Sequence, residues 1–283
     1  MDYKKLRTAG AILLAIGTAT TLTGCDSGGG GGGSSASAAP TVGSVPGAPV
    51  PPTSTRNFST DVMIFTGSGT WGTEISDAEA LFTANGITYQ EANSAQLDAM
   101  APADMAKFGI IFMPGGAGGT EAGSVSAQTH ANLRTAVQSL GLGYVGFCAG
   151  AFVAAAPAPS AGGDVSYGFG VVDAPVMNYY TGPGTSAAYE ETLETFADGH
   201  TENMLWYGGP ITPNTGVIAK YPTGDPAVSE MWSGSGFVIV AGTHPDLSAS
   251  SLSGLGASPA TSAQATALKI FNAAIHQQPL PTY

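Results

Sequence analysis

The sequence predicts an α/β domain whose sheet is mostly parallel and covered by helices on both faces. Short apolar runs such as Val62–Phe65 and Ile110–Met113 each stop at a glycine-containing loop. Amphipathic stretches of helical period lie between them, as at residues 74–85. Strands that are apolar on both faces and alternate with helices are typical of parallel sheets.

The elements follow in order along the chain. Ile75, Ala78, Leu81 and Phe82 form one stripe of the first helix, and Gly86 is expected to end it. Further strands are expected at 87–89, 110–113 and 143–147, and further helices at 125–140 and 149–156. After Pro157 the pattern becomes strand-like over 165–222. A hairpin of 227–232 and 236–242 and a last helix over 260–277 complete one domain, 58–283.

The first 24 residues have the pattern of an export signal. Lys4, Lys5 and Arg7 precede an uncharged apolar stretch that is too short to span a bilayer. It ends in Leu22-Thr23-Gly24-Cys25, which resembles the lipobox of bacterial lipoproteins. The resemblance implies a lipid (palmitate-type) anchor on Cys25, against the alternative of an ordinary secretory signal with a chance cysteine.

Residues 25–57 are expected to be a flexible linker. They hold the glycine run 28–33 and several prolines, a composition that does not bury a core. The linker would hold the domain off the periplasmic side of a membrane in the cell envelope. Asp26 resembles an inner-membrane retention signal.

The charge of the chain excludes one class of partner. Without residues 1–24 the chain has 8 − 3 = 5 basic and 20 − 1 = 19 acidic residues, a formal charge of −14. Such a surface is repelled by nucleic acids.

Cys148 would be the one thiol left after lipidation of Cys25. It lies in Gly146-Phe147-Cys148-Ala149-Gly150, between an expected strand and an expected helix. This is the pattern of a nucleophile elbow, with Cys in place of Ser and small residues where the backbones pass. The elbow would expose the sulfur. The alternative is a glycine-rich strand end with an inert buried cysteine.

Two other loops follow expected strands. His244 and Asp246, in Gly-Thr-His-Pro-Asp, could take the Cys148 proton and fix the imidazole tautomer. Pro114-Gly115-Gly116 could present backbone N–H groups to a substrate oxygen. All three loops are expected at the carboxyl edge of the sheet.

The order of these motifs, with Tyr207-Gly208-Gly209-Pro210 between the second and the last, resembles the biotin–protein ligase N-terminal domain family. That family is a branch of the class I glutamine amidotransferase-like superfamily. The resemblance implies a flavodoxin-like sheet extended by antiparallel strands, with Cys148 as nucleophile, His244 as base and Asp246 as acid. Gly115, Gly116 and Ala149 map to the oxyanion region, and Tyr207 and Gly208 to the substrate side.

Departures from the family leave the function open. Gly150 is followed by Ala151-Phe152, where glutamine amidotransferases carry a Gln, and no biotinyl-adenylate segment occurs, so biotin ligation is not inferred. The main hypothesis is a thiol-dependent hydrolase acting on a small-molecule or peptide amide or acyl group. The alternatives are a non-catalytic binding module and a thiol sensor.

The remaining candidates are weaker. His200 is expected in a solvated loop, His130 on a helix surface and His276 near the chain end. Trp206 is expected either in the pocket or in the core. No metal signature occurs, and no cofactor is expected.

Overall fold

The computed structural model describes residues 56–155, 168–172, 177–182 and 189–283. The expected signal peptide, Cys25 and all but the last two residues of the expected linker lie outside the described residues. Within the described residues no helix is both long enough and apolar enough to cross a membrane.

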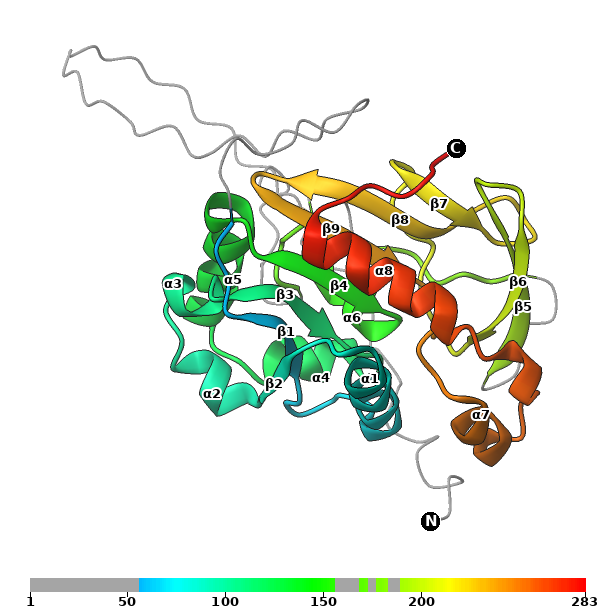
Figure 1. Ribbon diagram of the computed structural model, residues 1–283, viewed down its shortest axis with the longest axis horizontal. Coiled ribbons are helices and arrows are strands. Elements are labelled where there is room, and N and C mark those ends of the chain that lie inside the picture. Colours follow the sequence, from blue (N-terminus) through cyan, green and yellow to red (C-terminus); the bar gives the residue numbers. More distant parts are fainter. Residues whose placement is uncertain (1–55, 156–167, 173–176, 183–188) are drawn as a thin grey trace, which may run out of the picture. The chain divides into compact units, whose positions relative to one another are not determined.

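The described strands form one nine-stranded sheet in the order β2-β1-β3-β4-β9-β8-β7-β5-β6 (Figure 1). The strands are β1 Thr60–Phe65, β2 Tyr89–Ala92, β3 Phe108–Met113, β4 Gly143–Phe147, β5 Glu190–Phe196, β6 Thr201–Trp206, β7 Val217–Lys220, β8 Pro226–Ser233 and β9 Gly236–Ala241. The pairs from β2 to β9 are parallel, and the pairs from β9 to β6 are antiparallel. The predicted fold class, a flavodoxin-like sheet with antiparallel C-terminal strands, is confirmed.

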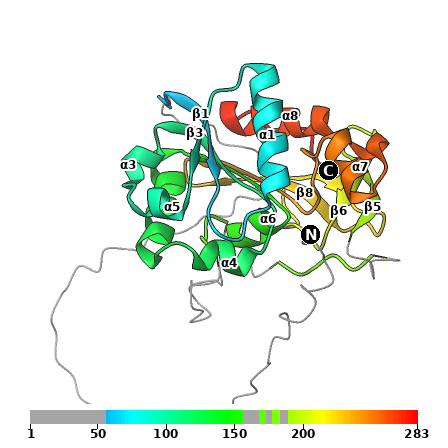
Figure 2. The ribbon, with the colours of Figure 1, turned by 90° about the horizontal axis from the view of Figure 1, so that it is seen from below.

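Helices cover both faces of the parallel half. They are α1 Gly72–Asn85, α2 Ser94–Asp98, α3 Pro102–Met105, α4 Gly118–Gly123, α5 Ala127–Leu140, α6 Ala149–Ala154, α7 Ala249–Leu255 and α8 Gln264–His276. Figure 2 shows α1 and α8 on one side of the strands and α4, α5 and α6 on the other. The antiparallel strands β5 and β6 lie beside α7.

The alternation of side chains along each strand divides the core into two layers. Val62 and Ile64 of β1 pack with Phe82 of α1 and Phe271 of α8. Met63 and its neighbours on the opposite face pack with α5 and α6. Every residue of β3, β4 and β9 is buried, as a strand covered on both faces requires.

The structure also differs from the predicted elements. β2 begins at Tyr89, where the prediction placed the strand at 87–89, and the helix predicted from 125 begins at Ala127. α2, α3, α4 and α7 were missed because they are four to seven residues long, too short for an amphipathic repeat. α1 ends at Gly86 in a left-handed conformation (φ 68°), as predicted.

Candidate active site

Cys148 lies at a sharp turn between β4 and α6. Its φ of 49° and ψ of −106° are outside the usual regions for a residue with a side chain. Within the described residues, Cys148 and Gln277 are the non-glycine residues with positive φ. Such a conformation costs about 1–3 kcal/mol and persists where the surrounding structure imposes it. The backbone therefore has the geometry of a nucleophile elbow.

Two glycines make this turn possible. A Cβ on Gly146 would overlap the carbonyl of Gly150, and a Cβ on Gly150 would overlap the carbonyl of Met113. Gly150 N–H also donates to Pro114 O at 3.1 Å. The start of α6 is thus packed directly against the end of β3, which places the Pro114-Gly115-Gly116 loop beside Cys148.

His244 reaches the same edge from the neighbouring strand. β9 is parallel to β4, with Phe147 opposite Ala241, and Cys148 N–H donates to Ala241 O at 2.8 Å. His244 follows β9 by three residues, and its N–H donates to Leu205 O at 3.0 Å. Its side chain is only 1% exposed. Parallel neighbouring strands therefore bring the cysteine and the histidine to one end of the sheet.

Cys148 and His244 make no direct hydrogen bond in this structure. The Cys148 thiol donates to Tyr207 O at 3.4 Å. Within the described residues neither ring nitrogen of His244 has a hydrogen-bond partner. Cys148 is 5% exposed, whereas the sequence predicted an exposed sulfur. The elbow turns the sulfur toward the loop that follows β6, and this loop covers it.

Glu74 is the carboxylate beside the imidazole. Its Oε1 lies 3.1 Å from His244 Nδ1, and both side chains are buried. The two atoms are at ion-pair distance without the alignment of a linear hydrogen bond. Glu74 Oε2 accepts a hydrogen bond of 2.5 Å from Gly115 N–H. Glu74 therefore links the first turn of α1 to the glycine loop and to His244.

Asp246, the acid expected from the sequence, is buried near both Glu74 and His244. It is fully buried, and its carboxyl group interacts with that of Glu74. Burial raises the pKa of Glu74 to about 8, opposed by the Gly115 N–H. Burial, followed by the neighbouring Glu74, raises the pKa of Asp246 well above its usual range. Both shifts favour the protonated carboxyl groups near neutral pH.

A third buried carboxyl group, that of Glu121 in α4, lies under Gly116. A Cβ on Gly116 would come within 2.6 Å of Glu121 Oε1. Burial raises the pKa of Glu121 to about 8, with a smaller contribution from Glu74. Neither oxygen of Glu121 has a hydrogen-bond partner among the described residues.

The expected oxyanion donors have different environments. Gly115 N–H is already bonded to Glu74. Gly116 N–H and Ala149 N–H have no hydrogen-bond partner within the described part of the chain. Gly116 is exposed and Ala149 is buried beside the thiol. Two backbone donors therefore remain available near Cys148.

Aromatic rings surround the histidine. Trp71 meets His244 edge to face at 5.1 Å between ring centroids, and it meets Tyr207 at 5.9 Å. Tyr207, 38% exposed, lies at the surface, and its neighbour Gly208 has a φ of 74°. Trp206 is buried in the core, where its indole N–H donates to Gly209 O.

The sequence reasoning did not single out Glu74 and Trp71. A signal for Glu74 was present, because residues 74, 78 and 81 share one face of α1 and a carboxylate on an apolar stripe needs a partner. Trp71 precedes the helix in a loop, where nothing in the local pattern fixes the direction of its ring.

The other histidines lie away from this edge. His130, predicted on a helix surface, is 4% exposed: Nε2 lies 2.9 Å from Ala122 O and the ring packs against Phe169. The surface prediction was wrong because α4 and Phe169 cover that side of α5. His200 is partly exposed beside Asp198 and stacks on Phe196. Among the described residues, no group of three His, Cys, Asp or Glu has the geometry of a metal site.

The fold is shared with solved protein structures. No family model matches the chain, and no curated protein matches it in sequence. A glutamine amidotransferase crystal structure is 17% identical, with a TM-score of 0.50, and the match covers 66% of this chain and 90% of that one.

A second structure, described as a GMP synthase protein from Thermoplasma acidophilum, is 10% identical. Its TM-score is 0.48, and the match covers 77% of this chain and 94% of that chain. An exo-β-1,4-mannosidase from an Opitutaceae bacterium is 14% identical, with a TM-score of 0.44. That match covers 76% of this chain and 36% of the mannosidase chain. The first match, together with the sheet order, shows that the chain shares the fold of that glutamine amidotransferase structure.

Proposed function

We propose that this protein is a thiol-dependent hydrolase that acts on an amide or related acyl group through Cys148 and His244. The observation that carries the proposal is the strained Cys148 at the end of β4, with a buried His244 at the end of the adjacent parallel strand. A strained turn and a buried imidazole whose nitrogens make no hydrogen bond are costly, and such features cluster at active sites.

The proposed reaction has two steps. Cys148 Sγ attacks the carbonyl carbon while His244 takes the thiol proton and passes it to the leaving amine, so that the C–N bond breaks and a thioester forms. Water, deprotonated by His244, then attacks the thioester, releasing the acid and restoring the thiol. Before the first step the thiol must turn from Tyr207 O toward the imidazole.

Backbone and side-chain groups support these steps. Gly116 N–H and Ala149 N–H, which have no backbone partner among the described residues, would stabilise the oxygen that becomes negative when the carbonyl is attacked. Glu74 orients the imidazole through Nδ1, and Asp246 acts through Glu74. In this proposal Asp246 is a positioning residue one contact further from the substrate than the sequence motif implies.

A panel of chromogenic amides, thioesters and activated esters tests the proposal with the purified full chain. The wild type and a Gly123→Ala control should hydrolyse at least one class, because a Cβ on Gly123 meets no atom within 4 Å. Cys148→Ala should abolish that activity. Hydrolysis that survives Cys148→Ala would overturn the assignment of the nucleophile.

A binding module on the same fold is the second candidate. The contact between the thiol and Tyr207 O, in place of one with His244, favours it, as does the 5% exposure of Cys148. A ligand that stabilises the wild type and Cys148→Ala equally in thermal melts, with no turnover of any panel substrate, would support this reading.

We also propose, from the sequence, that residues 1–24 are removed, that Cys25 is lipidated and that residues 25–57 tether the domain on the periplasmic side of a membrane. Asp26 favours the inner membrane. Cys25→Ala should abolish incorporation of radiolabelled palmitate and release the protein from the membrane fraction. Palmitate labelling that persists in this variant would contradict the anchor.

A further inference from the structure

We infer that the substrate group bound beside Cys148 is neutral or cationic, and that a carboxylate or phosphate is disfavoured there. The inference rests on the proposed function and names the substrate class for that site. Two observations carry it: every basic side chain after residue 25 is held elsewhere, and the surroundings of Cys148 and His244 are acidic and aromatic. The five basic residues are Arg56, Lys107, Arg134, Lys220 and Lys269.

Arg56 and Lys107 lie at the opposite edge of the sheet. The guanidinium of Arg56 donates to Gly109 O, near the start of β3, and to Ile275 O. Lys107 precedes β3 and pairs with Asp104 at 2.7 Å. Cys148 is beyond the other end of the strands. At roughly 3.3 Å per residue, six residues of β3 separate the two edges by about 20 Å.

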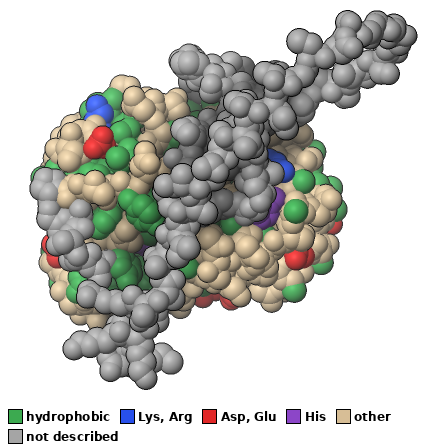
Figure 3. Space-filling view, turned by 180° about the vertical axis from the view of Figure 1, so that it is seen from behind, with side chains coloured by type: hydrophobic (Ala, Val, Ile, Leu, Met, Phe, Trp, Pro, Cys, Tyr) green, Lys and Arg blue, Asp and Glu red, His purple; other side chains and the backbone are tan. Residues whose placement is uncertain are grey.

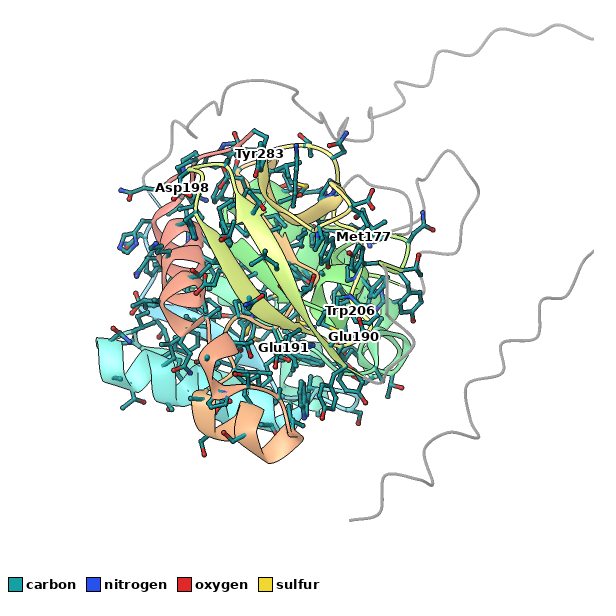
Figure 4. All side chains as sticks on the ribbon, turned by 90° about the vertical axis from the view of Figure 1, so that its right-hand side faces the viewer. Met177, Glu190, Glu191, Asp198, Trp206 and Tyr283 are labelled. Atoms are coloured by element: carbon teal, nitrogen blue, oxygen red, sulfur yellow. The ribbon has the colours of Figure 1, made fainter. Side chains whose placement is uncertain are left out.

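Lys220 and Lys269 lie at the turn of the hairpin formed by β5 and β6. Lys220 pairs with Thr195 in the sheet, and its ammonium lies 3.9 Å from the centroid of the Tyr283 ring. Lys269 contributes to lowering the pKa of Asp198 at the hairpin turn. Figure 4 shows Asp198 and Tyr283 at one end of this hairpin and Trp206 at the other. Tyr207, which contacts Cys148, follows Trp206.

Arg134 is the remaining cation. Its guanidinium donates to Phe169 O at 2.9 Å, and Phe169 N–H bonds to Val153 O near the end of α6. Cys148 is at the other end of α6. The segments 156–167, 173–176 and 183–188 contain no Lys or Arg in their sequence. On the face in Figure 3, the described Lys and Arg side chains are sparse and scattered.

Acidic groups surround the catalytic pair instead. Glu74, Glu121 and Asp246 are all buried around His244 and the glycine loop. Glu190 lies opposite Trp206 in the β5–β6 pair and is partly exposed at the end of the hairpin near Tyr207. A substrate anion would lose its water here with no Lys or Arg side chain to replace it, and it would approach the partly exposed Glu190.

The aromatic rings favour the opposite kind of ligand. Trp71 contacts His244, and Tyr207 contacts Trp71 with 5.9 Å between ring centroids. Tyr189 contacts Tyr207 with 6.4 Å between ring centroids, so a row of aromatic rings extends from the imidazole to the surface. Ring faces attract ammonium and guanidinium groups and pack well against neutral apolar groups. An amide that carries an amine or an uncharged ring next to its carbonyl therefore fits this site.

Charge-matched thiol reagents test the inference. The full chain would be treated with methanethiosulfonates that carry trimethylammonium, methyl or sulfonate groups, and modification of the Cys148 peptide followed by mass spectrometry. Rates are divided by those for N-acetylcysteine amide, which removes intrinsic reactivity. We expect the cationic reagent to exceed the anionic one at least tenfold at low salt, with the ratio falling as salt is raised. Equal rates, or a faster anionic reagent, would overturn the inference.

Tyr207→Arg and Tyr207→Leu provide a matched pair. The arginine variant places a cation at position 207, between Trp71 and the surface. It should react with the anionic reagent about tenfold faster than the leucine variant does. If the wild type reacts faster with the anionic reagent but still hydrolyses amides, the inference is overturned and the proposed function is not. If Cys148 reacts with none of the three reagents, both the inference and the proposed function are overturned.

Discussion

The Nδ1 atom of His244 lies 3.1 Å from Oε1 of Glu74, and these two residues are 170 positions apart in the chain. The motif acid Asp246 is buried near the same two side chains, and neither of its carboxyl oxygens has a hydrogen-bond partner among the described residues. The carboxyl group at ion-pair distance from the imidazole thus comes from the first turn of α1, while the cysteine and histidine come from the ends of β4 and β9. A site assembled in this way depends on the packing of α1 against the sheet.

Glu74→Gln should lower kcat roughly 10- to 100-fold with little change in KM, since an oriented base typically contributes 10²–10⁴-fold. The amide keeps the volume and an oxygen for Gly115 N–H. Unlike the carboxyl group of Glu74, however, it cannot give up a proton to balance the charge of an imidazolium as that ion forms. Steady-state kinetics on the best panel substrate, measured from pH 5 to 9, provide the readout. Asp246→Asn should have the smaller effect, and the reverse order would assign the orienting role to Asp246.

Gly115→Ala should lower activity by at least tenfold. A Cβ at Gly115 would overlap Cε1 of His244 and approach Glu74 Oε2 to 2.6 Å, so the imidazole must move. Overpacking of this kind costs about 1–3 kcal/mol of stability. Urea denaturation and hydrolysis would be compared with the Gly123→Ala control in nearby α4. Full activity in Gly115→Ala would show that the position of the imidazole is not critical.

Gly150→Val should prevent folding or abolish the site. Its Cβ would overlap the Met113 carbonyl oxygen, which belongs to the backbone of a central strand and cannot move aside. We expect a loss of more than about 3 kcal/mol in the free energy of unfolding. Circular dichroism and urea denaturation give the measurement. A variant with unchanged stability would contradict the close approach of α6 to β3.

Glu194→Gln should remove part of a pH dependence of stability. Glu194 is fully buried and accepts a hydrogen bond from Thr243 at 2.8 Å. Burial raises its pKa to about 8. The folded state therefore keeps a proton that the unfolded state releases above about pH 4.3, so stability falls as pH rises from about 4.3 to 8.

The variant should gain about 1–3 kcal/mol at pH 8 and little at pH 4.5, as measured by urea denaturation at both values. Glu191→Gln is the control for replacing a carboxyl group by an amide on the same strand, at an exposed position that accepts a hydrogen bond from Ser258 N–H. An equal change in Glu194→Gln at both pH values would show that Glu194 ionises normally.

The sequence predicted the fold class and the edge at which the site forms, because strand periodicity and glycine turns are local. The strand predicted at 143–147 has the observed bounds of β4, and the elbow follows it. The partners of His244 and Cys148 were not predictable in this way. Glu74 reaches His244 only through the packing of α1, and the thiol meets Tyr207 through the loop after β6. Both contacts join segments that are far apart in the sequence, and the local sequence pattern does not indicate that these segments meet in the fold.

Acylation of Cys148 tests the central claim most directly. The full chain would be mixed with excess p-nitrophenyl acetate at pH 7, with p-nitrophenol release followed optically and the adduct located by peptide mass spectrometry. We predict a burst of one equivalent, an acetyl group on Cys148, no burst in Cys148→Ala, and a burst slowed at least tenfold in His244→Ala. Acylation of Cys148 at the same rate in the wild type and in His244→Ala would contradict the account.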